Sequence, residues 1–364
     1  MARKQEPAAP RRKKRRSVAG LVAQDLLMTL AFLCVFALFH HVLPRWQPKT
    51  AEIVAPVSIR TPETVPPETV PPETAAPETA APEETAEPSP EPTSEPETPP
   101  SWRERFSEYF SDEIVETDDG YTSPSVSVQI RYYEEKIGGI PQRYYVADIH
   151  IAEIDCLRTA PAYNGFTVYG AESVLSLAAK NGAILAVNGD YCNVQRYGLL
   201  VRNGDLYFSD PAACDICVLF EDGTMETWEE GSYDVDEILA RKPYQIWRFG
   251  PALLDAEGKA RSSFDDAPVF ANRHPRTGLG YYEPGHYCLV VFEGRFNDAG
   301  GLSVADFAAF FEQLGCRCAY NMDGGASSVM AFRNRVCNRQ SSERYLGDII
   351  FVCEPDTPWP EIVS

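Results

Sequence analysis

One short stretch near the C-terminus, Asn-Met-Asp-Gly-Gly-Ala-Ser-Ser, combines residue types that can perform chemistry. Apolar residues before it predict a short buried strand, which ends at the carboxylate of Asp323 and turns through Gly324 and Gly325. The hydroxyls of Ser327 and Ser328 follow before the chain becomes apolar again. A carboxylate at a strand end is held by a rigid element and can face a cleft. An Asp-Gly pair is also a common hairpin turn, so the stretch alone leaves both interpretations open.

A second strand end has the same form. The apolar residues 183–187 predict a buried strand and are followed directly by Asn188, Gly189 and Asp190. If both strand ends reach one cleft, Asp190 and Asp323 supply a pair of carboxylates of the kind used in acid–base catalysis. The alternative is that both strands end in ordinary turns.

Two arginines are candidates for binding an anion. Arg276 lies in the sequence His-Pro-Arg-Thr-Gly, and Arg295 lies in the sequence Glu-Gly-Arg that begins at Glu293. The planar guanidinium fork suits phosphate oxygens, and Glu293 is a candidate second carboxylate. Surface ion pairs, or a structural pair between Glu293 and Arg295, are the alternatives. His274 is interpreted as a turn residue and not as a base.

The order of these motifs resembles that of the phosphodiester glycosidase family. The shared elements are the stretch around Asp323, the Asn-Gly pair at 188–189, the Pro-Arg-Thr sequence at 275–277 and the Glu-Gly-Arg sequence at 293–295. Together the resemblance covers about residues 140–353. The chain departs from the family pattern after Asn188, where Asp190 and Tyr191 replace the usual glycine and aromatic residue. A role for Asp190 therefore rests on its chemistry alone.

The resemblance implies a hydrolase that cleaves a sugar-1-phosphodiester at the anomeric carbon and releases a sugar and a phosphate monoester. Family members include N-acetylglucosamine-1-phosphodiester alpha-N-acetylglucosaminidases and bacterial proteins linked to exopolysaccharide, so a cell-envelope or exopolysaccharide glycan is the expected substrate. We assign carboxylate roles in catalysis to Asp323 and Glu293. We assign substrate binding to Arg276, Arg295, Asn188, Asp190, Gly324, Gly325, Ser327 and Ser328.

Two other functions stay open. A membrane-tethered glycan-binding module without activity would keep the fold and the sugar contacts but lack a competent carboxylate. A metal-dependent phosphoesterase would use Asp190, Glu293 and Asp323 as oxygen ligands, although no His-rich metal motif supports it. We therefore predict no cofactor, and a divalent metal is the weaker alternative.

Cysteine usage leaves a further choice. Of ten cysteines, Cys34 lies in an apolar N-terminal segment and the others follow it. An exported domain favours disulfides, and the odd number beyond Cys34 leaves at least one thiol unpaired. The pairs Cys214–Cys217 and Cys316–Cys318 can instead supply four thiolates to zinc, but the Cys-x-Cys spacing is unusual for such a site.

The elements that must position these motifs predict an α+β fold, with a mixed sheet core and a few packed helices. The clearest helix runs from Ser303, a plausible N-cap, to Leu314, and Gly315 ends it. A shorter helix is predicted over residues 173–180. Strands are predicted over 126–133, 143–154, 183–187, 244–249, 287–292 and 348–352, with hairpins over 198–208 and 217–228.

The N-terminal part has a different character. Six consecutive basic residues at 11–16 precede a long apolar run, which is typical of a transmembrane helix whose basic flank stays in the cytoplasm. No small-residue cleavage site follows, so an anchor is favoured over a cleaved signal peptide. Repeats of Pro, Glu and Thr come next and predict a disordered, extended stalk. The predicted organisation is 1–17 basic cytoplasmic tail, 18–43 membrane anchor, 44–100 stalk, 101–119 neck helix, 120–354 extracytoplasmic phosphodiester glycosidase-like domain and 355–364 tail.

The charge distribution restricts the partners. The chain has a net charge of −20, and nearly all of it lies beyond residue 100 because the basic tail and the acidic stalk almost cancel. Such a surface repels nucleic acid, so no nucleic-acid partner is expected. A phosphorylated glycan must instead meet a local basic site.

Overall fold

The computed structural model describes residues 57–58, 100–166, 170–192, 198–210, 214–264 and 267–362. The chain divides into two compact units, residues 1–52 and 53–364, and every described residue belongs to the second. The predicted cytoplasmic tail and membrane anchor, and nearly all of the predicted stalk, lie outside the described residues. Among the residues that are described, no helix is long and apolar enough to cross a membrane.

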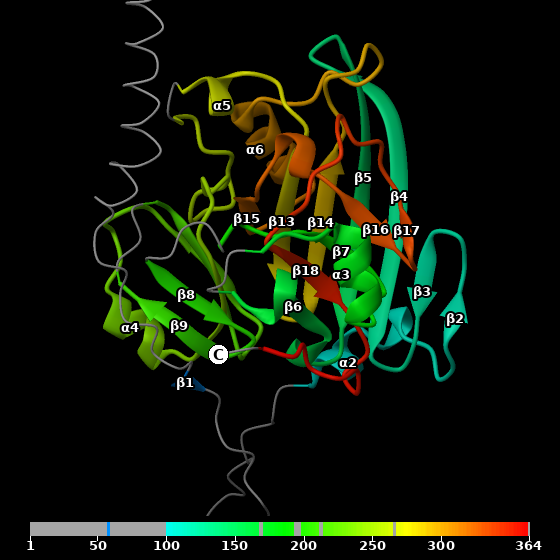
Figure 1. Cartoon of the computed structure of the whole chain (residues 1–364), viewed down its shortest axis with the longest axis vertical. Helices are drawn as coiled ribbons and strands as arrows, with labels where there is room; N and C mark the ends of the chain where they lie inside the picture. Colours follow the sequence, from blue (N-terminus) through cyan, green and yellow to red (C-terminus); the bar gives the residue numbers. More distant parts are fainter. Residues whose placement is uncertain are drawn as a thin grey trace, which may run out of the picture. The chain divides into compact units, whose positions relative to one another are not determined.

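Two large sheets form the framework of the domain (Figure 1). The seven-stranded sheet has the order β15 (Cys318–Asn321), β13 (Arg276–Glu283), β14 (His286–Phe292), β5 (Ile140–Ile151), β4 (Val126–Ile137), β3 (Gly120–Thr122) and β2 (Val115–Glu116). The five-stranded sheet has the order β17 (Arg335–Val336), β16 (Met330–Phe332), β7 (Leu185–Asn188), β18 (Asp348–Val352) and β6 (Leu157–Pro161).

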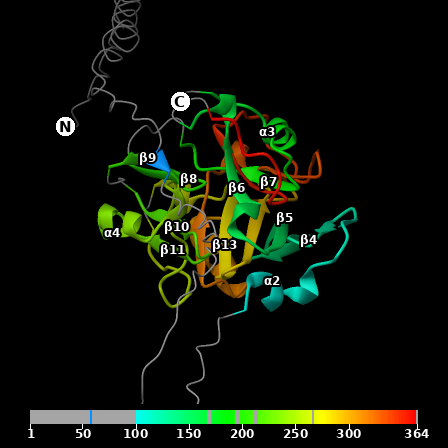
Figure 2. The same ribbon diagram turned by 90° about the horizontal axis from the view of Figure 1, so that it is seen from below.

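Two small sheets and several short helices complete the described structure (Figures 1 and 2). The small sheets have the orders β1 (Val57–Ser58), β9 (Asp205–Ser209), β8 (Leu199–Arg202) and β11 (Met225–Trp228), β10 (Ile216–Phe220), β12 (Pro243–Trp247). The α-helices are α2 (Trp102–Arg105), α3 (Val174–Lys180), α4 (Val235–Ala240), α5 (Pro268–Ala271) and α6 (Val304–Gln313). Short 3-10 turns lie at Ser107–Tyr109, Ile154–Cys156, Ala162–Asn164 and Gly325–Ser327.

The five-stranded sheet is apolar on both faces. In β18, Ile350 and Val352 join the core cluster that contains strands of the seven-stranded sheet, whereas Ile349 and Phe351 pack with α3. This follows from the period of two along a strand, which sends alternate side chains to opposite faces. Figure 2 shows α3 beside β7 on the outer face. The two large sheets therefore pack face to face, and α3 covers the outer side of the smaller one.

Helix α6 covers the other face of the seven-stranded sheet. Its Phe307 and Phe311 pack in one cluster with residues of β14. The opposing strand β13 carries Gly278 and Gly280, where an added Cβ atom would lie 2.8 and 2.9 Å from Phe311. Glycine at these two positions lets the aromatic rings of the helix come close to the sheet. The helix begins after Ser303, whose hydroxyl accepts a hydrogen bond from the backbone of Asp306, as the N-cap prediction requires.

The α+β class, the sheet-dominated core and the scarcity of helices are confirmed. The mixed sheet is corrected, because every strand pairing among the described residues is antiparallel. The neck helix over residues 101–119 is wrong. Only Trp102–Arg105 is α-helical, and the Thr117–Gly120 turn, closed by a hydrogen bond from Thr117 N to Gly120 O, leads into a hairpin that extends the large sheet. Turn-forming residues there override the amphipathic pattern.

Candidate active site

Asp323 lies just beyond the end of β15, in a loop that is fastened to the start of β13. The backbone N–H of Met322 donates to Thr277 O, and that of Gly325 donates to Pro275 O, both at 2.9 Å. These bonds continue the pairing of β15 with β13 past the last residue of the strand. The two motifs that the sequence singled out, around Asp323 and around Arg276, are thus held side by side.

The two glycines after Asp323 differ in conformation. Gly325 has a φ of 68°, whereas Gly324 has a φ of −121°, which other residues adopt freely. A Cβ atom on Gly325 would also lie 3.0 Å from Arg295 Nη2. Of the two glycines in the predicted turn, Gly325 is therefore the one whose backbone conformation requires glycine.

Substitution of Gly325 by valine is expected to lower the free energy of unfolding by about 1–3 kcal/mol, because a β-branched residue is strained at positive φ. Chemical denaturation of the variant measures this loss. The matched control is Gly324→Ala, which requires no positive φ and only a small shift from Pro275 O at 3.0 Å. Equal losses in the two variants would contradict the assignment.

Asn188 connects the end of β7 to the same loop. Its Nδ2 donates to Asp323 O at 2.6 Å, and its Oδ1 accepts from Thr277 Oγ1 at 2.8 Å and from Val329 N at 3.3 Å. The side chain is fully buried. Asn188 therefore positions Asp323, and its predicted contact with substrate stays a prediction.

A cavity of about 240 Å³ opens beside Asp323. It is lined by Phe249, Val269, Phe270, His274, Arg276, Arg295, Asp323, Gly324, Gly325, Ala326 and Arg344. The structure thus brings together five of the predicted site residues: the carboxylate of Asp323, two arginines and both glycines. The lining combines apolar side chains with three arginines, a composition suited to a small ligand with one charged group.

Several polar atoms around the Asp323 loop are buried and lack a hydrogen-bond partner among the described residues. They include Asp323 Oδ2, Ser327 Oγ and Ser328 Oγ. Buried polar groups are normally hydrogen-bonded, so each exception calls for a reason. Asp323 lines the cavity itself, and the two hydroxyls follow it in the same loop. Neither serine lines the cavity, and the Ser327 hydroxyl acts on the Asp323 carboxyl, so substrate binding by Ser327 and Ser328 stays a prediction.

The pKa of the Asp323 carboxyl is raised, which is the direction useful to a catalytic group. Burial raises the pKa of its carboxyl, and the negative charge of Asp190 acts in the same direction. The hydroxyl of Ser327, the charge of Arg344 and the backbone of Gly324 oppose this shift in pKa. A raised carboxyl pKa brings proton transfer closer to neutral pH.

Arg276 is held by backbone carbonyl groups and keeps one guanidinium nitrogen available for a ligand. Its Nε donates to Leu302 O at 3.0 Å, and its Nη2 donates to Val269 O at 2.8 Å and to Asn272 O at 3.2 Å. Burial lowers its pKa to about 10, so it stays cationic at neutral pH. It forms no ion pair with any described carboxylate, and within the described residues Nη1 has no acceptor. That atom is free to bind an anion in the cavity.

Two further arginines, Arg295 and Arg344, line the same cavity. Arg295 is exposed, and its Nη2 donates to His274 Nδ1 at 3.3 Å. Burial, then the charges of Arg276 and Arg295, lower the pKa of His274, which favours the neutral ring. Arg344 is also exposed and lies over the ring of Tyr191 at 5.7 Å. Neither arginine pairs with a carboxylate among the described residues, so both are available to a phosphate.

Arg344 is a site residue that sequence reasoning missed. It lies in the polar segment Gln-Ser-Ser-Glu-Arg, which carries no motif and resembles an ordinary surface loop. Its place in the cavity depends on the tertiary fold, since it lies 21 positions after Asp323. No local signal in the sequence indicates it.

Replacement of Arg344 by glutamine is expected to raise KM for a sugar phosphodiester about tenfold, since a charge-assisted phosphate contact is lost. Because the Arg344 charge lowers the pKa of Asp323, the acidic limb of the pH–rate profile should also move to higher pH. Steady-state kinetics between pH 4 and pH 9 measure both effects. Arg103→Gln, at an exposed position in α2, serves as the control. An unchanged KM and pH profile would exclude Arg344 from the site.

Glu293 does not line the cavity, contrary to its predicted catalytic role. Its side chain is 2% exposed, and it accepts hydrogen bonds from Arg339 N at 2.7 Å and from Arg339 Nε at 2.8 Å. The Arg339 guanidinium in turn pairs with Asp298 at 3.0 Å. With both oxygens occupied, Glu293 is a structural anchor for the segment that contains Arg339.

Asp190 is also placed away from the cavity, which corrects the predicted substrate contact. It forms a fully buried ion pair with Arg202 at 2.7 Å, and its other oxygen accepts from Arg248 N at 2.9 Å. Asp348 lies 3.7 Å from the same Arg202, and burial and the Asp190 charge raise the pKa of Asp348 to about 7. Asp190 influences the site only through its charge on Asp323.

The proposed metal sites find no support in the described residues. Asp190, Glu293 and Asp323 do not form a group of convergent ligands. The four cysteines considered for zinc also do not converge, because Cys214 donates to Arg248 O and Cys316 lies 3.8 Å from Cys288. The nine cysteines in the described part of the chain are free thiols, so the expected disulfides are absent there.

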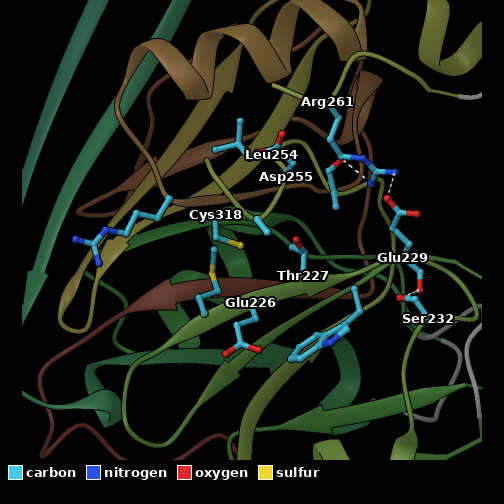
Figure 3. Close-up of a pocket in the computed structure, with 13 residues that line it drawn as sticks. Glu226, Thr227, Glu229, Ser232, Leu254, Asp255, Arg261 and Cys318 are labelled. Atoms are coloured by element: carbon cyan, nitrogen blue, oxygen red, sulfur yellow. Dashed lines mark hydrogen bonds and ion pairs between the residues drawn. The ribbon is translucent and has the colours of Figure 1, made fainter. Parts of the chain in front are cut away.

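A second cavity, of about 520 Å³, lies between β11 and residues 252–261 (Figure 3). Its main cation, Arg261, points toward Glu229 and forms ion pairs with Glu229 at 2.9 Å and Asp215 at 2.8 Å. None of the predicted catalytic or binding residues lines it. Three carboxylates, those of Glu226, Glu229 and Asp255, line this cavity beside two arginines, Arg261 and Arg317. The smaller cavity at Asp323 has three arginines and one carboxylate, so it is the better candidate for an anionic substrate.

The phosphodiester glycosidase family matches residues 181–353. A curated relative, the SPbeta prophage-derived uncharacterized protein YomE of Bacillus subtilis (strain 168), is 29% identical over 205 residues, which are 54% of this chain and 32% of that protein. The chain thus spans about a third of the length of that relative.

Among solved structures, the zebrafish N-acetylglucosamine-1-phosphodiester alpha-N-acetylglucosaminidase catalytic domain, auto-inhibited by its pro-peptide, is similar with a TM-score of 0.54. The match covers 66% of this chain and 88% of that chain at 16% identity. At this identity the likeness shows a shared fold.

Proposed function

The chain belongs to the phosphodiester glycosidase family through residues 181–353, and from this premise we propose that its domain hydrolyses a sugar-1-phosphodiester at the anomeric carbon. One observation carries the proposal. The cavity beside β15 is lined by Asp323, whose Oδ2 has no hydrogen-bond partner among the described residues, together with three arginines that form no ion pair among them.

All three arginines of the cavity bind the phosphate. Arg276, fixed by backbone carbonyls, presents Nη1 from the cavity wall, while the exposed Arg295 and Arg344 bind from the other sides. Their charges stabilise the negative charge that grows on the phosphate as its bond to the sugar breaks. A phosphate monoester leaves readily, so the site does not require a second carboxylic acid.

Asp323 acts at the anomeric carbon as nucleophile or base. The bond between the anomeric carbon and the phosphate oxygen breaks, and the electron pair goes to the phosphate. An oxygen from water ends on the sugar, either directly or after a covalent intermediate with Asp323. Asn188 holds the backbone of Asp323 in place, and the hydroxyl of Ser327 stabilises its ionised carboxylate.

The direct test is the phosphodiester of N-acetylglucosamine and p-nitrophenol, linked through C1 of the sugar. Cleavage at the anomeric carbon releases N-acetylglucosamine and p-nitrophenyl phosphate, and added phosphatase converts the latter to a coloured product. The expected result is colour that depends on both enzymes. No turnover of a panel of α- and β-linked sugar phosphodiesters would overturn the proposal.

We further propose that residues 18–43 anchor the domain in the cytoplasmic membrane, with the domain outside, where it meets a cell-envelope or exopolysaccharide glycan. The long apolar run and its basic flank support this. Protease added to intact cells is expected to remove the domain and leave the N-terminal tail protected. A tail that is digested from outside would contradict the orientation.

A further inference from the structure

A third cavity, of about 650 Å³, lies along strands β4 and β5 and beside β17. It is lined by Asp118, Asp119, Ile130, Arg131, Tyr132, Tyr133, Tyr145, Arg335, Val336 and Cys337. We call it the tyrosine groove. It shares no residue with the Asp323 cavity.

Two tyrosines from neighbouring strands form an aromatic surface in the groove. Tyr132 and Tyr145 are direct cross-strand partners, and their ring centroids lie 4.9 Å apart at an angle of 38°. Tyr132 is 45% exposed, and Val336 across the groove is 38% exposed. Exposed aromatic and aliphatic groups gathered in one hollow indicate a surface that contacts a ligand.

The polar groups of the groove carry little net charge. Asp118 and Asp119 supply two carboxylates and Arg335 supplies one guanidinium group, whereas Arg131, one residue before Tyr132 in β4, points to the opposite face of the sheet. None of these three groove side chains forms an ion pair with a described residue, although Thr117 Oγ1 donates to Asp119 Oδ1 at 3.0 Å and Arg335 donates to the backbone oxygen of Asp118. Two carboxylates and one guanidinium give the groove a formal charge of −1 on a protein of net charge −20. This small charge disfavours a nucleic acid or a strongly charged peptide.

A neutral glycan matches this combination of groups. The C–H groups on one side of a pyranose ring pack on an aromatic face, whose π-system is electron-rich. Carboxylates and guanidinium groups beside such a face accept from and donate to the sugar hydroxyls. The groove offers both kinds of contact in one place.

The groove also adjoins the segment that leads to the Asp323 cavity. Burial raises the pKa of Tyr145, and the charge of Glu293 is the next cause, which places Glu293 close to Tyr145. Two residues further along the chain, Arg295 lines the Asp323 cavity. Residues 293–295 therefore run from beside the groove to the proposed catalytic site.

We propose that the tyrosine groove binds a chain of neutral sugars belonging to the same polymer whose sugar-1-phosphodiester is hydrolysed at Asp323. This inference rests on the proposed function. It identifies the substrate as a polymeric glycan and not a small diester.

The test measures binding of neutral hexasaccharides of N-acetylglucosamine, glucose and mannose to the full chain by titration calorimetry. At least one hexasaccharide is expected to bind, and Tyr132→Ala to weaken its affinity about tenfold or more. Tyr132→Phe keeps the ring and is expected to bind nearly as well as the parent protein. Tyr163→Ala removes another exposed tyrosine, away from the groove, and should leave the affinity unchanged.

Hydrolysis of the p-nitrophenyl phosphodiester separates this inference from the proposed function, since a small diester does not reach the groove. Tyr132→Ala is expected to keep the parental rate on it. If the parent hydrolyses the diester but binds none of the hexasaccharides, or binds them independently of Tyr132, the groove proposal fails and the catalytic one stands. If Tyr132→Ala lowers both binding and diester hydrolysis, the groove is not a separate surface and the inference is also overturned.

Discussion

Asp323→Asn is expected to reduce kcat on a sugar-1-phosphodiester by about 10³-fold or more while leaving KM within a few-fold of the parent value. The substitution keeps the size of the side chain but removes the negative charge that attacks or activates at the anomeric carbon. Asp112→Asn, at an exposed position, is the matched control and should be without effect. Parental turnover in Asp323→Asn would exclude this residue from the chemistry.

The same variant separates catalysis from folding. Because burial raises the pKa of Asp323, its ionisation weakens the folded state as the pH rises through that pKa. Asparagine removes this cost, so Asp323→Asn should be at least as stable as the parent at neutral pH. The activity of the parent protein should depend on pH in the opposite direction to its stability, because catalysis requires the ionised carboxylate. The rate should therefore rise with pH through a pKa above the usual 3.8 of aspartic acid.

The largest expected effect on stability comes from Asp190→Ala. This change leaves Arg202 fully buried, with Asp348 at 3.7 Å as its remaining carboxylate neighbour. Breaking a buried ion pair in this way should cost about 3–5 kcal/mol of unfolding free energy, measured by chemical denaturation.

An exposed ion pair provides the comparison for Asp190→Ala. Arg241 and Glu226 pair at 2.6 Å, with about two-fifths of each side chain exposed. Glu226→Ala is expected to cost no more than about 1 kcal/mol. If Asp190→Ala costs no more than Glu226→Ala, the Asp190–Arg202 pair does not hold the core together as described.

Local signals in the sequence were sufficient for much of the fold. Helix α6 was predictable because Ser303 can cap it, its apolar residues recur with helical spacing and a glycine follows it. Strand β18 was predictable because residues 349–352 are four consecutive apolar residues, a run too short for a typical helix. Residues 101–119 were not, since their aromatic spacing suggested a helix, whereas Val115–Glu116 pairs with β3 across the following turn.

The residues of the candidate site were predictable where they belong to a local motif. Asp323, Arg276 and Arg295 belong to short motifs with glycine or proline neighbours, and all three line one cavity. Glu293 and Asp190 have equally good local patterns, yet each is occupied by an arginine that the tertiary fold brings to it. Whether a carboxylate is free or paired depends on such distant partners, which spacing along the chain does not reveal.

The central claim is that the bond to the anomeric carbon is the one that breaks, and the position of an isotope tests it most directly. A sugar-1-phosphodiester is hydrolysed by the full chain in water enriched in ¹⁸O, and both products are analysed by mass spectrometry. Cleavage at the anomeric carbon predicts one ¹⁸O atom in the released sugar and none in the phosphate monoester. Label in the phosphate would show attack at phosphorus and would contradict the assignment of Asp323 and the three arginines to a glycosidase site.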